Sequence, residues 1–374
     1  MNTTPFELDL DDLLHDLPEL RRVSNVDWSE HGGTRCLVAI AGFEPRCCAA
    51  PSRLAELGWQ AESSLMIRYG QEDMRDANDR YVERLSRILR EAAPGRKPVE
   101  LWHDDHCLEA DFGEKLVDAL TADGLDLTSP ASHVVLDITG GSSRLLLEGL
   151  HALLKTPASL TLIYSEAAWY WPRFEDYLQY TEESRGRSIP APEFLTVGVD
   201  KVEVLKSIPG HDADARPTFL VAFPSFSATR IGAVIEELSP SRVQWLFCIP
   251  HLVKNHWRID AQLEYHRALV EDQHRRCYVS TFDYRESLAA LECLYRKRRN
   301  DYNMLVCSLG SKLQKVGQVL FHLLRPEVGA VVSIPRTWDT DRVSDDAPRA
   351  VYCLHLGDCA ELRRKLLRTR TFRI

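Results

Sequence analysis

Four short segments of the chain place small or hydroxyl-bearing residues next to a cation. Glycine lets a ligand approach the backbone, serine and threonine supply hydroxyl donors, and arginine or lysine supplies charge, which together suit a phosphate or a phosphodiester. The candidate ligand-binding residues are Gly42, Phe43, Glu44 and Arg46; Thr139, Gly140, Gly141, Ser142, Ser143 and Arg144; Ser225, Ser227, Thr229 and Arg230; and Ser308, Gly310, Ser311 and Lys312. The alternative interpretation of any one segment is an ordinary helix start, because serine and threonine are common N-caps.

A regular framework must position these segments, and the hydrophobic pattern predicts one. Short apolar runs with little alternation are separated by helix-like stretches. In the first half the runs span 36–41, 64–69, 99–103, 133–137 and 160–164; in the second half they span 218–223, 243–249, 277–280, 304–307 and 330–334. Such runs are typical of strands in a parallel sheet that helices cover on both faces. The sequence therefore predicts an α/β protein with two tandem Rossmann-like parallel-sheet domains, which we expect to be duplicated and to form an internal pseudo-dimer.

Changes in composition give the expected domain boundaries. They are an acidic leader at 1–33, a first Rossmann-like domain at 34–168, a connector at 169–216, a second Rossmann-like domain at 217–358 and a basic C-terminal tail at 359–374. The connector is rich in proline, glycine and charge, and its residues 194–198 are a candidate extra strand. The basic tail is interpreted as a solvated terminal helix rather than a nucleic-acid arm.

The four segments follow the first and fourth strands of each half. In a doubly wound sheet, ligands bind beyond the carboxyl ends of the strands, at the point where the strand order reverses. Each segment also opens a helix, whose N-terminus offers free N–H groups and the positive end of the helix dipole. We therefore expect an anion-binding cleft lined by segments of both halves.

Composition excludes several classes of protein. The 374 residues carry 46 lysines and arginines against 55 aspartates and glutamates, a formal net charge of −9, which argues against binding to extended nucleic acid. The N-terminal stretch does not have the pattern of a secretory signal, and no apolar run approaches the roughly 20 residues that cross a bilayer. We therefore expect a cytoplasmic protein without a membrane partner, whose ten cysteines stay reduced.

Fingerprints of the common cofactor and enzyme classes are missing from the sequence. It contains no G-x-x-x-x-G-K-[ST], no G-x-G-x-x-G, no G-x-S-x-G and no H-E-x-x-H. This argues against P-loop ATP hydrolysis, dinucleotide-dependent redox chemistry and serine hydrolysis. There is no C-x-x-C pair either, so a zinc ribbon is not expected. We predict no cofactor and no metal.

Three further groups have two interpretations each. The His-Asp-Asp-His run at 103–106 could bind a divalent metal, but neighbouring residues on an extended strand point to opposite faces, which favours a polar loop. His251 and His256, with Arg258 nearby, follow the second strand of the second half and could contact a nucleotide. The aromatic run at 169–171 could stack on a base, although core packing is favoured.

The segment from Asp137 to Arg144 resembles the strand–Thr-Gly-Gly–helix motif of CARF domains, the CRISPR-associated Rossmann-fold sensors. The two halves together are similar to SAVED domains, which resemble two fused CARF units. The resemblance implies a cyclic oligonucleotide ligand, held where two Rossmann units meet, with residues 139–142 in contact with it. Where CARF motifs often carry lysine this chain has Ser143, with Arg144 next; in the second half Lys312 restores the cation.

We therefore expect a sensor that recognises a nucleotide, cyclic or similar, in an antiviral or stress defence system and acts through a protein effector as partner. Three alternatives stay open at this stage. The cleft could cleave such a ligand as a phosphodiesterase of the ring-nuclease type. The layout also fits a glycosyltransferase built of two Rossmann domains. A duplicated fold that has lost its ligand would serve only as a scaffold.

Overall fold

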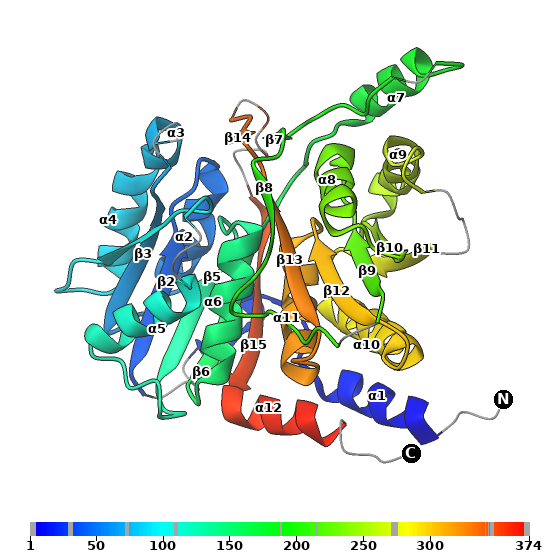
Figure 1. Ribbon diagram of the computed structural model, residues 1–374. Helices are drawn as coiled ribbons and strands as arrows, with labels where there is room; N and C mark the ends of the chain where they lie inside the picture. Colours follow the sequence, from blue (N-terminus) through cyan, green and yellow to red (C-terminus); the bar gives the residue numbers. More distant parts are fainter. Residues whose placement is uncertain are drawn as a thin grey trace. The chain divides into compact units, whose positions relative to one another are not determined.

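The computed structural model of the chain describes residues 5–28, 33–71, 75–107, 111–187, 189–213, 216–270, 276–340, 342, 344 and 348–369, with side chains from residue 10 onward. The chain forms two compact units. Unit 1 comprises Met1–Trp169 and Ser344–Ile374, and unit 2 comprises Tyr170–Val343. Each unit is built around its own sheet, and each is described by itself (Figure 1).

Unit 1 contains a seven-stranded sheet in the order β1-β15-β6-β5-β2-β3-β4. Its strands are β1 (Arg21–Arg22), β2 (Arg35–Ile40), β3 (Ser63–Tyr69), β4 (Val99–His103), β5 (His133–Asp137), β6 (Ser159–Ala167) and β15 (Pro348–Asp358). Strands β2 to β6 are parallel, whereas β15 runs antiparallel to β6 and β1 antiparallel to β15. The chain moves outward from β2 to β4 and then returns to place β5 beside β2. The strand order therefore reverses between β2 and β5.

Helices cover both faces of the unit 1 sheet. One face carries α2 (Ala49–Glu56) and α4 (Val82–Ala92), and α5 (Phe112–Ala122) packs with α6 (Ser143–Lys155) and α12 (Cys359–Arg368) on the other (Figure 1). The remaining helices are α1 (Pro5–Asp16), η1 (Val23–Asn25), η3 (Pro45–Cys48) and α3 (Arg75–Asp79). Because both faces are covered, every residue of β5 is buried, which explains its unalternated apolar sequence.

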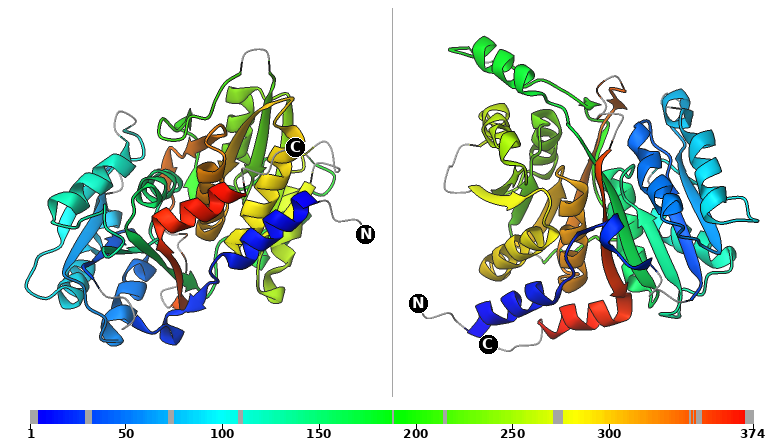
Figure 2. Two further views of the ribbon diagram at one scale, coloured as in Figure 1. Left: turned by 90° about the horizontal axis from the view of Figure 1, so that it is seen from below. Right: turned by 180° about the vertical axis from the view of Figure 1, so that it is seen from behind.

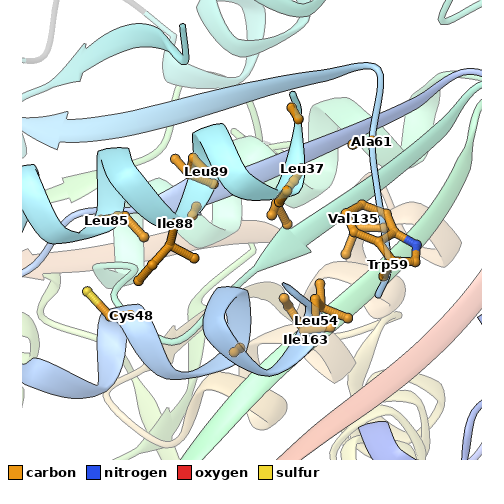
Figure 3. Close-up of a cluster of buried hydrophobic side chains, with 14 of the residues drawn as sticks. Leu37, Cys48, Leu54, Trp59, Ala61, Leu85, Ile88, Leu89, Val135 and Ile163 are labelled. Atoms are coloured by element: carbon orange, nitrogen blue, oxygen red, sulfur yellow. The ribbon is translucent and has the colours of Figure 1, made fainter. Parts of the chain in front are cut away.

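A single hydrophobic cluster joins α2 and α4 to the sheet (Figure 3). Leu37 and Val135 project from adjacent parallel strands, and Leu54 of α2 and Leu89 of α4 pack against them. Trp59 closes the cluster at its edge. This packing holds the first strand and its following loop in place, so it positions the segment that begins at Gly42.

Unit 2 repeats this topology with a six-stranded sheet in the order β11-β10-β9-β12-β13-β8. Its strands are β8 (Lys201–Val204), β9 (Thr218–Phe223), β10 (Arg242–Ile249), β11 (Arg276–Ser280), β12 (Asn303–Ser308) and β13 (Gly329–Ile334). All pairs are parallel except that of β8 with β13. The order reverses between β9 and β12, at the position equivalent to β2 and β5 of unit 1.

The unit 2 sheet is also covered on both faces. Helix α8 (Ala228–Leu238) and α9 (Trp257–Tyr265) pack on one face, and α10 (Tyr284–Arg298) packs with α11 (Lys312–Leu324) on the other (Figure 1). The other elements are α7 (Phe174–Glu183), η5 (Val253–Asn255) and a two-stranded ladder of β7 (Thr196–Val197) with β14 (Thr337–Trp338). The protein is thus an α/β protein with two Rossmann-like domains, as predicted. Among the described residues, no helix has the length and apolar character needed to span a membrane.

The predicted strands coincide with the observed parallel strands, but the expected boundaries differ from the observed units, as two strands show most clearly. The range 217–358 was expected to be one domain, whereas β15 pairs along most of its length with β6 of unit 1 (Figures 1 and 2). The range 169–216 was expected to be a connector, whereas its β8 completes the sheet of unit 2. Both strands pair with partners that are far away in sequence, so no local pattern assigns them to their sheets. Part of the predicted leader and tail, 1–4, 29–32 and 370–374, lies outside the described residues.

The placement of β15 predicts which unit a core substitution will weaken. Leu354→Ala removes a fully buried side chain from β15 and should cost about 2–5 kcal/mol of stability. Hydrogen exchange measured by mass spectrometry should show faster exchange in β5 and β6, with β9 and β12 unchanged. The exposed Leu367 provides the control, since Leu367→Ala should cost less than about 0.5 kcal/mol. Faster exchange in β9 rather than β6 would contradict the pairing.

Candidate functional site

The four predicted segments lie where the strand order reverses, two in each unit. We call the loops after β2 and β5 the rim of unit 1 and the loops after β9 and β12 the rim of unit 2. In unit 1, Gly42 lies beside Gly140: a Cβ at Gly42 would be 3.8 Å from the Cα of Gly140. In unit 2, the amide of Leu309 donates to the carbonyl of Phe223 at 3.0 Å. The structure therefore brings together the two segments of each unit.

In the rim of unit 1, the protein's own side chains occupy the N-terminus of α6. Ser142 caps the helix by accepting from the amide of Leu145 at 3.2 Å, and its hydroxyl donates to Oδ1 of Asp105 at 2.7 Å. The amide of Ser142 donates to the Tyr69 hydroxyl at 2.7 Å, and this hydroxyl donates to the carbonyl of Gly140 at 3.0 Å. A carboxylate and a phenol thus already fill the place where an anion would bind.

Asp105 stays ionised in this position. Burial alone would raise the pKa of Asp105, but His103, Ser142 and the charge of Arg144 together hold the pKa below its ordinary value. Nε2 of His103 lies 2.9 Å from Oδ1 of Asp105. The run at 103–106 therefore forms an internal polar network. Within the described part of the chain, no group of three or more His, Cys, Asp or Glu side chains could hold a metal ion.

The two cations predicted for the rim of unit 1 are bound to the protein itself. Arg144 is 4% exposed; its Nε donates to Glu148 at 3.2 Å, and its Nη1 donates to the carbonyls of Asp104, Asp105 and Cys107 at 3.4, 3.1 and 2.7 Å. Arg144 therefore clamps the loop after β4.

Arg46 has an equivalent structural role after β2. Its Nε donates to Oε2 of Glu44 at 2.5 Å, and its Nη1 donates to the carbonyl of Ser165 at 3.1 Å. The carboxylate and the guanidinium of this segment thus neutralise each other, and the neighbouring Phe43 is partly buried.

The Thr-Gly-Gly corner of unit 1 is a buried packing feature. The Thr139 hydroxyl donates to Oδ1 of Asp137 at 2.5 Å and accepts from the amide of Ser165 at 2.9 Å. Burial raises the pKa of Asp137 to about 7, against the hydrogen bonds from Thr139 and the charge of Arg46. A Cβ at Gly140 would lie 2.9 Å from the carbonyl oxygen of Ile40, so this position needs glycine.

The rim of unit 2 has the same corner with neutral partners. Ser311 caps α11 by accepting from the amide of Gln314 at 3.1 Å, and its hydroxyl donates to the carbonyl of Thr281 at 2.6 Å, where unit 1 has the Asp105 carboxylate. The Gln314 side chain accepts from the amide of Ser311 at 2.8 Å, in the place of Tyr69. Ser227 caps α8, with Thr229 in its first turn, and Ser225 adopts a left-handed φ of 51°, a strained value found often at binding sites.

Lys315 is a buried cation in the rim of unit 2. It is 2% exposed, and its Nζ donates to the carbonyl of Gly310 at 2.7 Å. Burial holds the pKa of Lys315 well below its ordinary value, and the charges of Lys312 and Arg230 lower it further. The groups that oppose this shift are the thiols of Cys248 and Cys307; no carboxylate of the described residues is among them.

A second cation, the partly buried Arg258 of α9, bonds to neutral oxygens. Its guanidinium donates to the carbonyls of residues 170, 171 and 172 at 3.1, 2.8 and 2.6 Å and lies 4.3 Å from the centre of the Phe226 ring. Burial lowers the pKa of Arg258 to about 10. Arg258 and Lys315 both act electrostatically on Cys248, whose sulfur lies 3.6 Å from the Cβ position of Gly310. The two cations therefore flank the end of β10.

Two buried hydroxyls complete the rim of unit 2. Arg230 donates to the backbone carbonyl of Ser333 on β13. The side-chain hydroxyls of Ser333 and of Ser308, at the end of β12, are buried and have no hydrogen-bond partner among the described residues. Buried hydroxyls in proteins normally have partners, so each of these two retains an unused hydrogen-bonding capacity.

The sequence signal for Lys315 is its spacing. It lies four residues after Ser311 and three after Lys312, which places all three on one side of the first turns of α11. The match to the CARF motif ends at Lys312, so it does not reach Lys315, which lies about one helical turn later. Arg258 appears in the sequence only as a neighbour of His251 and His256, and its approach to the rim depends on how α9 packs.

The other aromatic candidates have structural contacts. The ring of His251 stacks on Phe282 with centroids 4.2 Å apart. Trp171 packs against a buried cluster that includes Phe194 and Tyr265, in agreement with the core-packing interpretation. His256 is exposed at the start of α9.

No family model matches the chain, and the comparison with curated proteins finds no match. Among solved structures, a type III CRISPR defence DNA nuclease activated by cyclic oligoadenylate aligns at 10% identity and a TM-score of 0.46 over 76% of this chain; the chain spans 63% of the length of that protein. The UDP-GlcNAc 2-epimerase of Neisseria meningitidis aligns at 10% identity and a TM-score of 0.20, over 74% of this chain and 77% of its own. Phosphoethanolamine N-methyltransferase 1 of Haemonchus contortus aligns at 11% identity and a TM-score of 0.20, over 81% and 72%.

The clamp formed by Arg144 predicts a stability effect. Arg144→Met leaves Glu148 buried without its cation and should cost about 3–5 kcal/mol in urea unfolding. The double variant Arg144→Met with Glu148→Met should recover part of this loss, because the unpaired carboxylate is removed as well. A single variant as stable as the parent would show that the clamp has no structural role.

A substitution of Lys315 should change the free energy of unfolding in the opposite direction. Lys315→Met removes a buried cation that has no carboxylate partner, and it should stabilise unit 2 by about 1–3 kcal/mol in urea unfolding. The unfolded chain binds the lysine proton more tightly than the folded chain, so the parent gains stability as the pH rises toward the ordinary lysine pKa. The advantage of the variant should therefore be larger at pH 6 than at pH 9. A variant less stable than the parent at both pH values would contradict the assignment.

Proposed function

We propose that this protein is a receptor for a phosphorylated ligand of the nucleotide type, and that the rim of unit 2 binds the ligand's anionic group. One observation carries the proposal: Arg230, Arg258, Lys312 and Lys315 gather where the strand order reverses, and Arg258 and Lys315 donate to neutral backbone carbonyls. A buried cation is costly unless a negative charge compensates it. A bound anion would supply that charge.

The geometry of the rim favours a phosphate group over a simple carboxylate. The N-termini of α8 and α11 both begin at this edge, and each contributes free amides and the positive end of a helix dipole. The hydroxyls of Ser308 and Ser333 add donors that the protein leaves without a partner among the described residues. A tetrahedral anion with several acceptor oxygens can use donors from several directions at once.

The contrast between the two units supports the choice of unit 2. In unit 1 the equivalent positions hold their own anions, since Asp105 lies at the N-terminus of α6 and Glu44 pairs with Arg46. An anionic ligand would compete there with carboxylates already in place. The rim of unit 2 has no such competitor in its cap, because Ser311 bonds to a backbone carbonyl.

We further propose that the ligand is a cyclic oligonucleotide and that the protein acts in antiviral or stress defence through a protein effector. The support for this step is the resemblance of the strand-to-helix corners to the CARF motif, in which Lys312 takes the place of the usual cation. Cleavage of the ligand is a separate question, which analysis of the products addresses.

Calorimetry with cyclic di-, tri- and tetra-adenylate, and with the linear forms, tests the proposal. We expect one of them to bind with a Kd in the micromolar range or below. Lys315→Met and Arg258→Met should each weaken binding at least tenfold, since each removes a charge from the anion site. Lys297→Met is the matched control: Lys297 is an exposed cation at the C-terminal end of α10, at the opposite end of the sheet, and its loss should leave the affinity unchanged.

Two further measurements with the same ligands separate the alternative functions. A ligand at 100 times its Kd should add about 2.7 kcal/mol of stability, which a thermal melt detects. Chromatography of the incubated ligand would reveal linear products if the protein is a phosphodiesterase. Absence of binding and of a thermal shift for every nucleotide would refute the receptor and favour a scaffold.

A further inference from the structure

The charged and titratable groups around Lys315 come from four elements. Lys312 lies one turn earlier on α11, and Arg230 approaches from α8. Cys248 at the end of β10 and Cys307 on β12 are the other groups that act on it. Burial raises the pKa of Cys248 to about 11 and that of Cys307 to about 12, so both thiols are neutral near pH 7. No negative charge therefore balances the Lys315 ammonium among these groups.

The contacts of the Lys315 amine also provide no negative charge. Its Nζ bonds to the neutral carbonyl of Gly310, and the side chain is 2% exposed, so water contributes little to stabilising a charge. An ammonium buried with like charges nearby and no counter-charge releases its proton more readily than one in water. An anion placed among Lys312, Arg230 and Lys315 reverses this balance, because it stabilises the protonated amine directly.

We propose that the rim of unit 2 binds its anion together with a proton, which the amine of Lys315 takes up. This inference rests on the proposed function, since it requires that the rim bind an anion. The step is balanced: the neutral amine accepts a proton from solvent or buffer, and the ammonium then pairs with the anion. No covalent bond to the ligand forms or breaks.

The coupling has a defined pH dependence. Where the amine is neutral in the free protein and protonated in the complex, one proton enters per anion, and the affinity falls up to tenfold for each unit of pH increase. Acidification thus favours the loaded state. If the amine were protonated in both the free protein and the complex, the affinity would not show this dependence on pH.

Sulfate is the probe for the test, because it is a dianion throughout pH 6–9 and does not itself titrate there. Titration calorimetry at pH 7.5 and constant ionic strength is performed in buffers with different enthalpies of ionisation, such as Tris and HEPES. The dependence of the observed heat on the buffer gives the number of protons taken up. We expect proton uptake on sulfate binding to the unmodified full chain, and weaker binding at pH 8.5 than at pH 6.5.

Two variants assign the proton to Lys315. Lys315→Arg carries a permanently charged group, so it should still bind sulfate but take up no proton. Lys297→Arg makes the same chemical change at an exposed lysine outside the anion site and should leave the uptake unchanged. A thermal melt of each variant verifies that it is folded.

The outcomes are distinct. Sulfate binding with proton uptake that Lys315→Arg abolishes supports the inference. Sulfate binding to the unmodified chain with no dependence on buffer or pH refutes the proton coupling and leaves the anion site intact. Absence of sulfate binding at any pH refutes both the coupling and the anion site of the proposed function.

Discussion

The accumulation of positive potential at one edge of each sheet is the constraint on which the rest of this structure depends. Parallel strands all end at the same edge, and the helices that follow begin there, so their free amides and dipoles add at one place. Negatively charged groups at this edge stabilise the arrangement. Unit 1 does this with its own side chains: Asp105 at the start of α6, Glu44 on Arg46, and Glu148 on Arg144.

Unit 2 has the same topology, but different groups contact the N-terminus of the corresponding helix. The serine that caps α11 donates to a carbonyl where its counterpart in unit 1 donates to a carboxylate, and a glutamine amide takes the place of a tyrosine hydroxyl. Lys315 in this rim donates to the neutral carbonyl of Gly310. Unit 1 thus pairs the cations of its rim with its own carboxylates, whereas we propose that an external anion takes this role in unit 2. The difference lies in a few side chains on a shared framework.

Buried cations of this kind oppose folding, and the surrounding core makes them tolerable. The apolar cluster of unit 2 that includes Leu220, Phe247 and Val331 supplies stability that lets a lysine remain in an unfavourable place. Ligand-binding sites commonly lower the stability of the folded protein. A charged or polar group that binds a ligand strongly is often one that has no good partner in the protein itself.

The sequence by itself determined the parallel strands, the helices between them and the four rim segments, because burial on both faces and helix caps leave local patterns in β2, β5, β9 and β12. It did not determine that β15 joins the first sheet or that β8 completes the second, since both strands pair with partners that are distant in sequence and that no local pattern specifies. It also could not tell Arg144, which clamps a loop, from Lys315, which donates to the carbonyl of Gly310. Both are cations near the start of a helix. Only the tertiary structure decides which acceptors surround each one, because those acceptors come from loops and strands remote in sequence.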